Sequence, residues 1–222
     1  MVLNDTCENA AMLFELFDPS VPQDVGLAMA CAEIAREKNT LVMAIIEISK
    51  NNESPISYYP KRPRLLNVFN SILFVQKDYP SESSEVNQVD FSTVHNAITG
   101  ISDTILIPGC IGVDFADVKS VVDTNTQGYH FTAHSKGSAR GLKAARKTVK
   151  KMHQMKRENL EPASALITVS TSECLGIKDV HEVVSYLQEN LPQDIDMIFS
   201  IIIDESAGEF LRISLYLWNY VT

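Results

Sequence analysis

The sequence predicts an α/β fold in which helices cover both faces of a parallel sheet. Three observations lead to this prediction. Apolar strand-like runs alternate with helical patterns through the first half of the chain, which is the order of βαβ units. These runs are apolar throughout rather than alternating, as expected for strands that are buried on both faces. The longest runs, such as Leu41 to Ile46, fall far short of the ~20 residues of a membrane span, so no transmembrane segment is expected.

Three apolar runs in the first half predict buried strands, at residues 10–17, 40–48 and 71–78. Residues 25–38 predict a helix that packs on this sheet. Its apolar positions are Leu27, Ala30, Cys31 and Ile34. Residues 49–64 are polar and contain prolines, so they predict a loop.

The second half predicts a smaller α+β unit. Helices are predicted at residues 90–106, from residue 113 onward, at 137–156 and at 177–190. Strands are predicted at residues 164–171, 196–205 and 210–218. The helix at 137–156 is amphipathic, because apolar residues share one face and cations occupy the other. The apolar positions are Leu142, Ala145, Val149 and Met152.

A formal net charge of −9 hides one strongly basic segment. Residues 124–157 contain no Asp or Glu but hold nine of the 19 basic residues, so the rest of the chain has ten basic against 28 acidic residues, a net −18. A solvated helix face is the simple interpretation, and a docking surface for an anionic partner is the functional one. Nucleic acid is the less favoured partner, because the segment has two aromatic residues and no groove-reading motif.

The cysteines and histidines predict neither a disulfide framework nor a metal centre. The four cysteines are scattered singly, which suits reduced thiols. The first residues lack the basic and apolar regions of a secretion signal, so a cytoplasmic location is expected. His130 and His134 have the spacing of two ligands on one helical face. No carboxylate follows them until Glu158, so no metal is expected.

Asp114 and Asp117 stand three residues apart on a turn that also carries Pro108, Gly109 and Gly112. Such a pair at the start of a helix is usually an N-terminal cap, which stabilises by roughly 1 kcal/mol. Spacing alone favours this structural role over a catalytic one.

The residues around this turn resemble the bacterial cell-division protein FtsZ, a relative of tubulin. The stretch ISDTILIPGCIGVDFADVKSVV, followed by GYHFTAHSKGSARGLKAARKTV, is similar to the central helix of FtsZ, its synergy loop and the segment that follows. In that family the loop typically reads N-V-D-F-A-D-V, so Gly112 replaces the usual asparagine. The later elements resemble the C-terminal domain of the family, and residues 12–48 resemble, more weakly, part of its nucleotide domain.

The resemblance implies a partial doubly wound parallel sheet, a truncated tubulin/FtsZ GTPase domain, joined by a central helix to a smaller α+β domain. It divides the chain into a remnant of the nucleotide-binding domain (10–88), the central helix and synergy loop (89–123), and a C-terminal-like domain (124–222). In the family's strand order 3-2-1-4-5-6, the first three strands are absent and Met12 to Phe17 becomes a sheet edge. An apolar edge invites pairing, so a homodimer or heteromeric complex through this strand is expected, unless the N-terminal residues or Tyr58 to Arg64 cover it.

Nucleotide binding is expected to be lost, so no GTP or other cofactor is predicted. The family signature G-G-G-T-G-T-G lets backbone N–H groups approach phosphates. At the corresponding residues 18–26 Gly26 alone remains, while two prolines lack N–H donors and two aspartates repel phosphate. Ser92 lies about where the family places a guanine-reading aspartate. A clone that begins within its gene is the competing explanation for the missing strands.

In the resembled family the synergy-loop acids reach into the nucleotide site of a neighbouring subunit and help to position the attacking water, because a carboxylate can accept its hydrogen bond and its proton. The resemblance assigns this role in trans to Asp114 and Asp117, with FtsZ or another FtsZ-like subunit as partner. Further candidate partner-binding residues are Gly112, Phe115, Lys143, Arg146, Lys147, Lys150 and Lys151.

The sequence thus predicts a non-nucleotide-binding FtsZ-like protein of the cytoplasm that modulates filament assembly at the division site. Two alternatives remain open. In the first, the chain is a scaffold or adaptor whose basic helix binds a membrane surface or nucleic acid, and the loop acids act as a cap. In the second, it is a GTPase whose site a partner chain completes.

Overall fold

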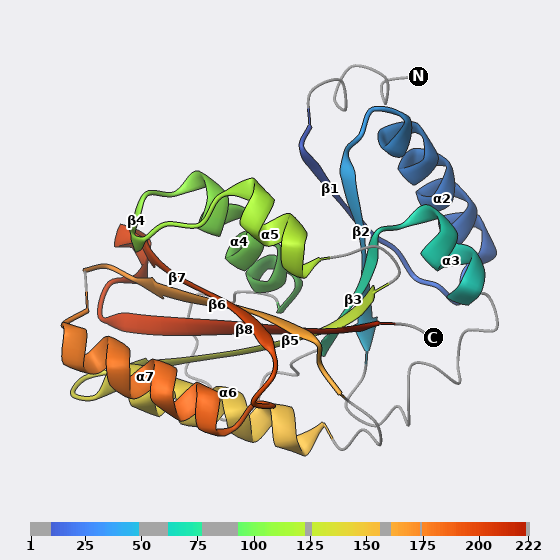
Figure 1. Cartoon of the computed structure of the whole chain (residues 1–222). Helices are drawn as coiled ribbons and strands as arrows, with labels where there is room; N and C mark the ends of the chain where they lie inside the picture. The colour runs from blue at the N-terminus through green and yellow to red at the C-terminus, as the bar shows by residue number, and fades with distance from the viewer. Residues whose placement is uncertain are drawn as a thin grey trace, which may run out of the picture.

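One eight-stranded mixed sheet connects the described parts of the chain (Figure 1). This computed structural model describes residues 10–48, 62–76, 93–122, 126–155, 161–173 and 175–220. The strand order is β1-β2-β3-β5-β8-β6-β7-β4. The strands are β1 (Met12–Leu16), β2 (Leu41–Ile48), β3 (Ser71–Gln76), β4 (Gly109–Ile111), β5 (Thr126–Lys136), β6 (Ser164–Thr171), β7 (Asp196–Ile203) and β8 (Phe210–Tyr220).

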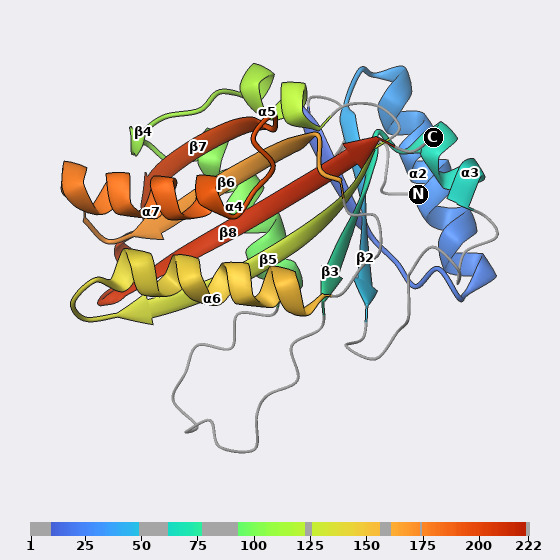
Figure 2. The same ribbon diagram turned by 60° about the horizontal axis from the view of Figure 1, so that its bottom comes forward.

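The parallel and antiparallel parts of the sheet meet at β5. Strands β1, β2, β3 and β5 are parallel neighbours, whereas β8 runs antiparallel to both β5 and β6. The β5–β8 ladder extends from the Thr126–Tyr220 pair to the Lys136–Phe210 pair, and the two strands lie side by side along their length in Figure 2. The predicted α/β fold with a partial parallel sheet is confirmed, and its two parts share one continuous sheet.

Helices cover both faces of the sheet, as predicted (Figure 1). One buried apolar cluster packs the sheet against α2 (Pro22–Glu37), α3 (Arg62–Val68), α6 (Arg140–Gln154) and α7 (Ile177–Glu189). A second cluster on the opposite face packs it against α4 (Thr93–Leu106) and α5 (Phe115–Val121). A short 3-10 helix, η1 (Glu205–Ala207), lies between β7 and β8.

Strand β1 forms an edge of the sheet, as predicted for Met12 to Phe17. Its neighbour on one side is β2, and within the described residues no strand pairs with its other side. Each of its five residues is half-buried or exposed, whereas β2 is buried at seven of eight positions. Residues 1–9 and 58–61, which were candidates to cover this edge, lie outside the described residues.

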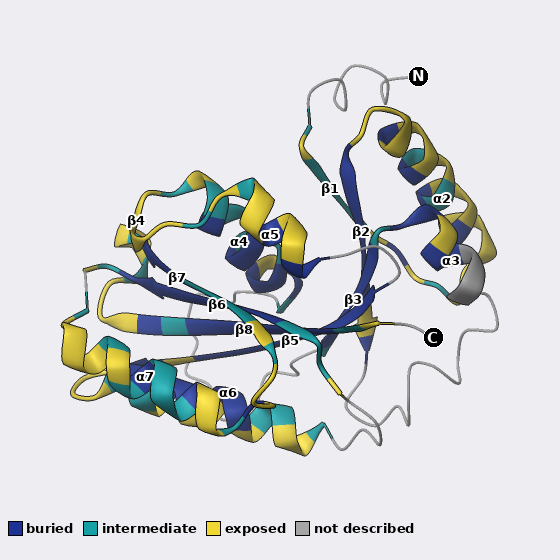
Figure 3. Cartoon of the chain, viewed as in Figure 1, coloured by how far each residue is buried: buried dark blue, intermediate teal, exposed yellow. Residues whose placement is uncertain are grey.

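Helix α2 packs on the sheet through a different face from the predicted one (Figure 3). Its buried residues are Val25, Ala28, Ala32 and Ala35. Leu27 and Ile34 instead remain 63% and 41% exposed. Small alanines let the helix lie close to the apolar sheet, and this leaves the larger apolar side chains outside.

The sequence patterns do not predict β5, β4 or α3. Strand β5 contains Gly128 and two histidines, so its apolar periodicity is weak. Its extended backbone corrects the interpretation of His130 and His134 as neighbours on a helix, because four residues of strand span about 13 Å. His130 is buried and His134 is exposed, so the two cannot bind one metal ion together.

Candidate functional site

Asp114 and Asp117 form a reciprocal capping box at the start of α5. The Asp117 backbone N–H donates to Asp114 Oδ1 at 2.8 Å, and the Asp114 N–H donates to Asp117 Oδ2 at 3.0 Å. Both side chains are exposed. The structural role predicted from the spacing is therefore present, and one oxygen of each carboxylate takes part in it.

The loop before this cap is held against the sheet by β4. Gly109 pairs with Ile202 of β7, and the Ser200 hydroxyl donates to Ile111 O at 3.1 Å. A Cβ at residue 109 would overlap Ile201 O, so a glycine is required for this close approach. A Cβ at Gly112 would meet nothing within 4 Å, so the position has room for the asparagine typical of the resembled family.

Phe115 differs in environment from the acids beside it. It is half-buried and packs against the apolar cluster shared with Val118 and Val121. Phe115 therefore anchors α5 on the sheet, whereas Gly112, Asp114 and Asp117 are exposed.

A layer of polar side chains between α4 and the sheet holds α4, the helix that leads into this loop. Arg212 donates to Asn96 Oδ1 at 2.7 Å and to Ser170 Oγ at 3.1 Å. The Tyr216 hydroxyl donates to Ala97 O at 2.8 Å, and burial raises the pKa of this tyrosine. The sequence signal for this layer is a set of small or polar residues on one helical face at Asn96, Gly100 and Thr104, all of them buried.

His130 lies beside this layer, with its ring 4.7 Å from the ring of Tyr216. Burial lowers the pKa of His130 to about 3, and the nearby charges of Arg212 and Lys151 act in the same direction. The imidazole is therefore neutral at physiological pH. Its ring packs against the ring of Tyr216.

The start of α2, which the resemblance aligns with the phosphate-binding signature of FtsZ, is unfavourable for an anion. The N-cap residue Val21 makes no side-chain cap, and Pro22 follows it at the first helical position. Asp18 accepts hydrogen bonds from the Ser20 N–H and hydroxyl, and these bonds lower the pKa of its carboxyl. Asp24 adds a second negative charge in the first turn. A phosphate here would meet two carboxylates and a proline.

The cations of α6 differ in their exposure and in their contacts within the chain. Lys143, Arg146, Lys147 and Lys150 are exposed, whereas Lys151 is half-buried. The Arg146 guanidinium lies 5.8 Å from the centre of the Tyr186 ring of α7, and Lys147 Nζ donates to His134 O at 3.1 Å. Two of the four exposed cations therefore have contacts within the chain, which fits the simple interpretation of a solvated face.

The structure does not bring the acids and the cations together. Helix α5 packs on one face of the sheet and α6 on the other (Figure 1). Gly112, Phe115 and the two acids therefore belong to one surface, and the basic residues of α6 belong to another.

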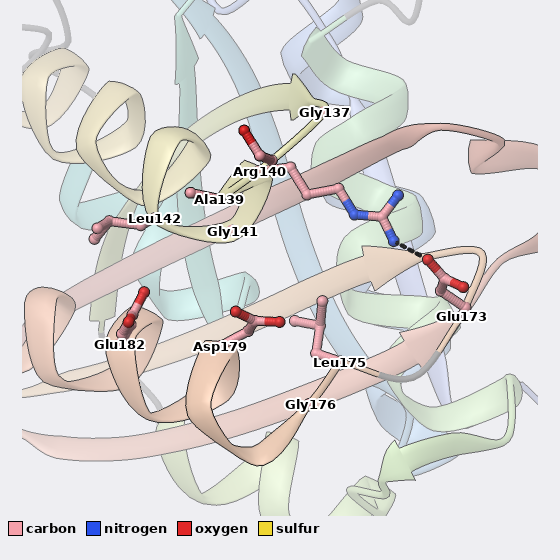
Figure 4. Close-up of a pocket in the computed structure, with 11 residues that line it drawn as sticks. Gly137, Ala139, Arg140, Gly141, Leu142, Glu173, Leu175, Gly176, Asp179 and Glu182 are labelled. Atoms are coloured by element: carbon pink, nitrogen blue, oxygen red, sulfur yellow. Dashed lines mark hydrogen bonds and ion pairs between the residues drawn. The ribbon is translucent and has the colours of Figure 1, made fainter.

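A cavity of about 240 Å³ lies between the starts of α6 and α7 (Figure 4). Its one cation, Arg140, donates to Glu173 Oε1 at 2.8 Å and to Glu209 O at 3.0 Å. Asp179 and Glu182 also line the cavity. The excess of carboxylates disfavours a phosphate, and the volume is below the ~300 Å³ at which ligand pockets usually begin.

No cluster of three metal-binding side chains is present in the described residues. Their helices are too short or too polar to cross a membrane. Cys110 is disulfide-bonded, which corrects the prediction that all four cysteines are reduced thiols.

Comparison with known proteins identifies the fold. No protein-family model matches the sequence. Two solved structures of FtsZ from M. jannaschii, a mutant and an empty dimer, match with TM-scores of 0.75 and 0.76 and identities of 20% and 19%. Both matches cover 98% of this chain, and 68% and 66% of the respective FtsZ chains. CetZ2 from Haloferax volcanii matches with a TM-score of 0.65 at 11% identity, over 94% of this chain and 65% of its own.

The chain therefore has the fold of FtsZ and CetZ, which belong to the tubulin superfamily. It spans about two thirds of the length of these structures.

Proposed function

We propose that this chain is a non-nucleotide-binding FtsZ-like protein that associates with FtsZ or another tubulin-like subunit and modulates filament assembly in cell division. The observation that carries the proposal is a contrast between two sites. The exposed acid pair of the synergy loop is in place at the start of α5, while the start of α2 opposes phosphate binding.

The acids are suited to a role in trans because the capping box uses one oxygen of each carboxylate. The side chains are exposed, so their second oxygens can accept hydrogen bonds from the water that attacks a neighbour's nucleotide. The cap also fixes the orientation of both carboxylates, which favours catalysis by positioning.

Apolar side chains near one end of the sheet support association with another subunit. Ile177, at the start of α7, is 90% exposed, and Leu106, just before β4, is 76% exposed. Both lie near the end of the sheet where β6 and β7 finish, since β4 pairs with the last residues of β7. Two structural neighbours are described as an FtsZ dimer and a CetZ2 protofilament, so this fold is known to assemble.

The test is sedimentation and GTP turnover of a full-length FtsZ, with and without the chain. The wild-type chain is expected to change polymer mass or turnover. The double variant Asp114→Asn/Asp117→Asn is expected to lose most of this effect, because asparagine keeps the cap but removes the charge. Ile177→Glu is expected to weaken association.

Asp24→Asn is the matched control, because it removes an exposed first-turn acid from α2 instead of α5. It should behave as the wild type does. If the wild-type chain changes neither polymer mass nor turnover, the proposal is wrong.

A second candidate function is an adaptor that binds an anionic surface through α6. It is favoured by the four exposed cations, which lie on the opposite face of the sheet from the synergy loop. In this case, salt-sensitive binding to anionic vesicles would be lost when these four residues are changed to glutamate, and it would persist in the double Asn variant.

A further inference from the structure

Among the described residues, no strand pairs with the outer side of β1, which carries apolar side chains. Strand β1 reads MLFEL and carries one charged residue, Glu15, whose pKa is raised by burial. Leu16, at the end of the strand, is 53% exposed. Such an edge has few of the charged residues that usually prevent pairing with another chain.

Helix α2 presents a second apolar surface beside this edge. Leu27, Ala30, Cys31 and Ile34 recur at helical spacing and form a stripe, here called the outer stripe of α2. The buried face of the same helix is a separate set of residues. Helix α2 is therefore apolar on two sides, which an isolated surface helix rarely is.

The outer stripe lies on the flank of α2 that faces the free edge. Arg36 donates to Asn67 O and Val68 O, so α3 occupies the flank near Arg36. On a helical wheel, Leu27 and Ile34 fall about 160–180° from Arg36, on the opposite flank. The exposed edge and the exposed stripe are therefore continuous.

The geometry of a sheet extended by a second copy fits this surface. A two-fold axis perpendicular to the sheet would pair β1 with its own copy as antiparallel neighbours and would keep both α2 helices on one face. Helix α2 packs over β1 and β2 alike, so its axis lies about one strand spacing, ~5 Å, from that two-fold axis. The two α2 helices would then be about 10 Å apart, within the 8–10 Å range of packed helices.

Two further features favour a second copy as the occupant. The other sheet edge in the described residues, β4, has three residues and leads into the synergy loop, so a head-to-tail pairing would have a much shorter ladder. Pairing centred on Phe14 would place Glu15 opposite Leu13 of the second copy, which avoids facing carboxylates.

We infer that β1 and the outer stripe of α2 form the interface of a two-fold symmetric homodimer. This interface is separate from the synergy loop and from α6, so it goes beyond the proposed function. A dimer of this kind would carry two synergy loops and two basic faces.

The test is the oligomeric state of the full chain by analytical ultracentrifugation and size-exclusion chromatography with light scattering. The wild-type chain is expected to be a dimer. Leu27→Glu/Ile34→Glu and Leu16→Lys are each expected to weaken dimerisation by more than about tenfold in Kd. Because these residues are exposed in the single chain, circular dichroism and thermal unfolding should show folded monomers. Ile177→Glu, a matched apolar-to-acid change far from this edge, should leave the dimer intact.

A second measurement tests the two-fold symmetry without a disruptive substitution. Cys31 lies in the outer stripe, so a short bismaleimide should link the two copies, and Cys31→Ser should abolish the covalent dimer. A wild-type chain that stays monomeric would overturn the inference. A dimer that persists in the α2 and β1 variants, or that is lost in Ile177→Glu, would also overturn it. The same holds if the bismaleimide links Cys31→Ser as efficiently as the wild type. None of these results bears on whether the chain acts on FtsZ.

Discussion

Asp114 and Asp117 form a cap whose geometry is compatible with the proposed role in trans. Each carboxylate accepts a backbone N–H of the other residue, so the pair stabilises the start of α5. The remaining oxygens are available to a partner. An alanine substitution would remove both roles at once, and for this reason asparagine is the informative change.

His130 makes the stability of the protein depend on pH. Neither ring nitrogen has a hydrogen-bond partner in the part of the chain that the structure describes, and the folded-state pKa is about 3 instead of 6.5. The unfolded chain therefore binds more protons between these values. The stabilising contribution is complete above pH 6.5 and is lost as the pH falls through this window.

His130→Phe should reduce this pH dependence while keeping a ring against Tyr216. Between pH 7 and pH 5, we expect the free energy of unfolding of the wild type to fall by about 2 kcal/mol more than that of the variant. Urea unfolding at the two pH values measures the difference. The raised pKa values of Glu15 and Asp103 act in the opposite direction, but they are common to both proteins. Equal pH dependence in the two proteins would contradict the prediction.

At the scale of elements, α2 and β4 show opposite uses of glycine. Gly26 lies inside α2, and a Cβ there would meet nothing within 4 Å. Gly109 lies in β4, where a Cβ would overlap Ile201 O. Packing within the single chain does not require a glycine at residue 26. It does require one at residue 109, where the close pairing of β4 with β7 positions the loop before α5.

Alanine at the two positions should have opposite effects on stability. Gly26→Ala should stabilise the protein by about 0.5–1 kcal/mol, because alanine has the higher helix propensity. Gly109→Ala should destabilise it by about 1–3 kcal/mol and disturb the β4–β7 pairing. Chemical denaturation, analysed at monomer concentrations, measures both effects. A destabilising Gly26→Ala would instead indicate that close approach at this position matters.

At the scale of the whole molecule, the sheet separates the candidate surfaces. The synergy loop lies with α4 and α5 on one face, α6 lies on the other, and β1 forms an edge. Partners at these three places would not compete for the same residues. A filament subunit, an anionic partner and a second copy could be bound independently, so their variants should give separable effects.

GTP should not stabilise the chain. A nucleotide with a Kd of about 10 μM, present at about 1 mM, would stabilise the folded state by about 2.7 kcal/mol and raise the Tm by several degrees. The carboxylates and prolines at the start of α2 predict no such shift. A thermal unfolding series with GTP and Mg²⁺ measures it, with ADP as a control for general nucleotide effects. A shift of several degrees with GTP alone would contradict the loss of nucleotide binding.

Much of the fold was predictable, because its strands and helices have strong local patterns. Strands β1, β2, β3, β6, β7 and β8 have apolar runs, and α4, α6 and α7 have helical periodicity. Strand β5 was not predictable in this way, because Gly128 and His130 are buried by neighbours distant in sequence. Of the candidate site, the cap at Asp114 was predictable from spacing, whereas the contacts of Arg212 with Asn96 and Ser170 were not.

The sequence by itself determined the alternation of elements, the acid pair at the start of α5, the basic face of α6 and the presence of a single glycine in residues 18–26. These features depend on neighbours within a few residues, where periodicity and capping act. Only the tertiary structure decided which face of α2 is buried, that the acids and cations lie on opposite faces, and that the sheet is continuous from β1 to β4. These features depend on contacts between segments that are distant in sequence, and local sequence patterns do not specify such contacts.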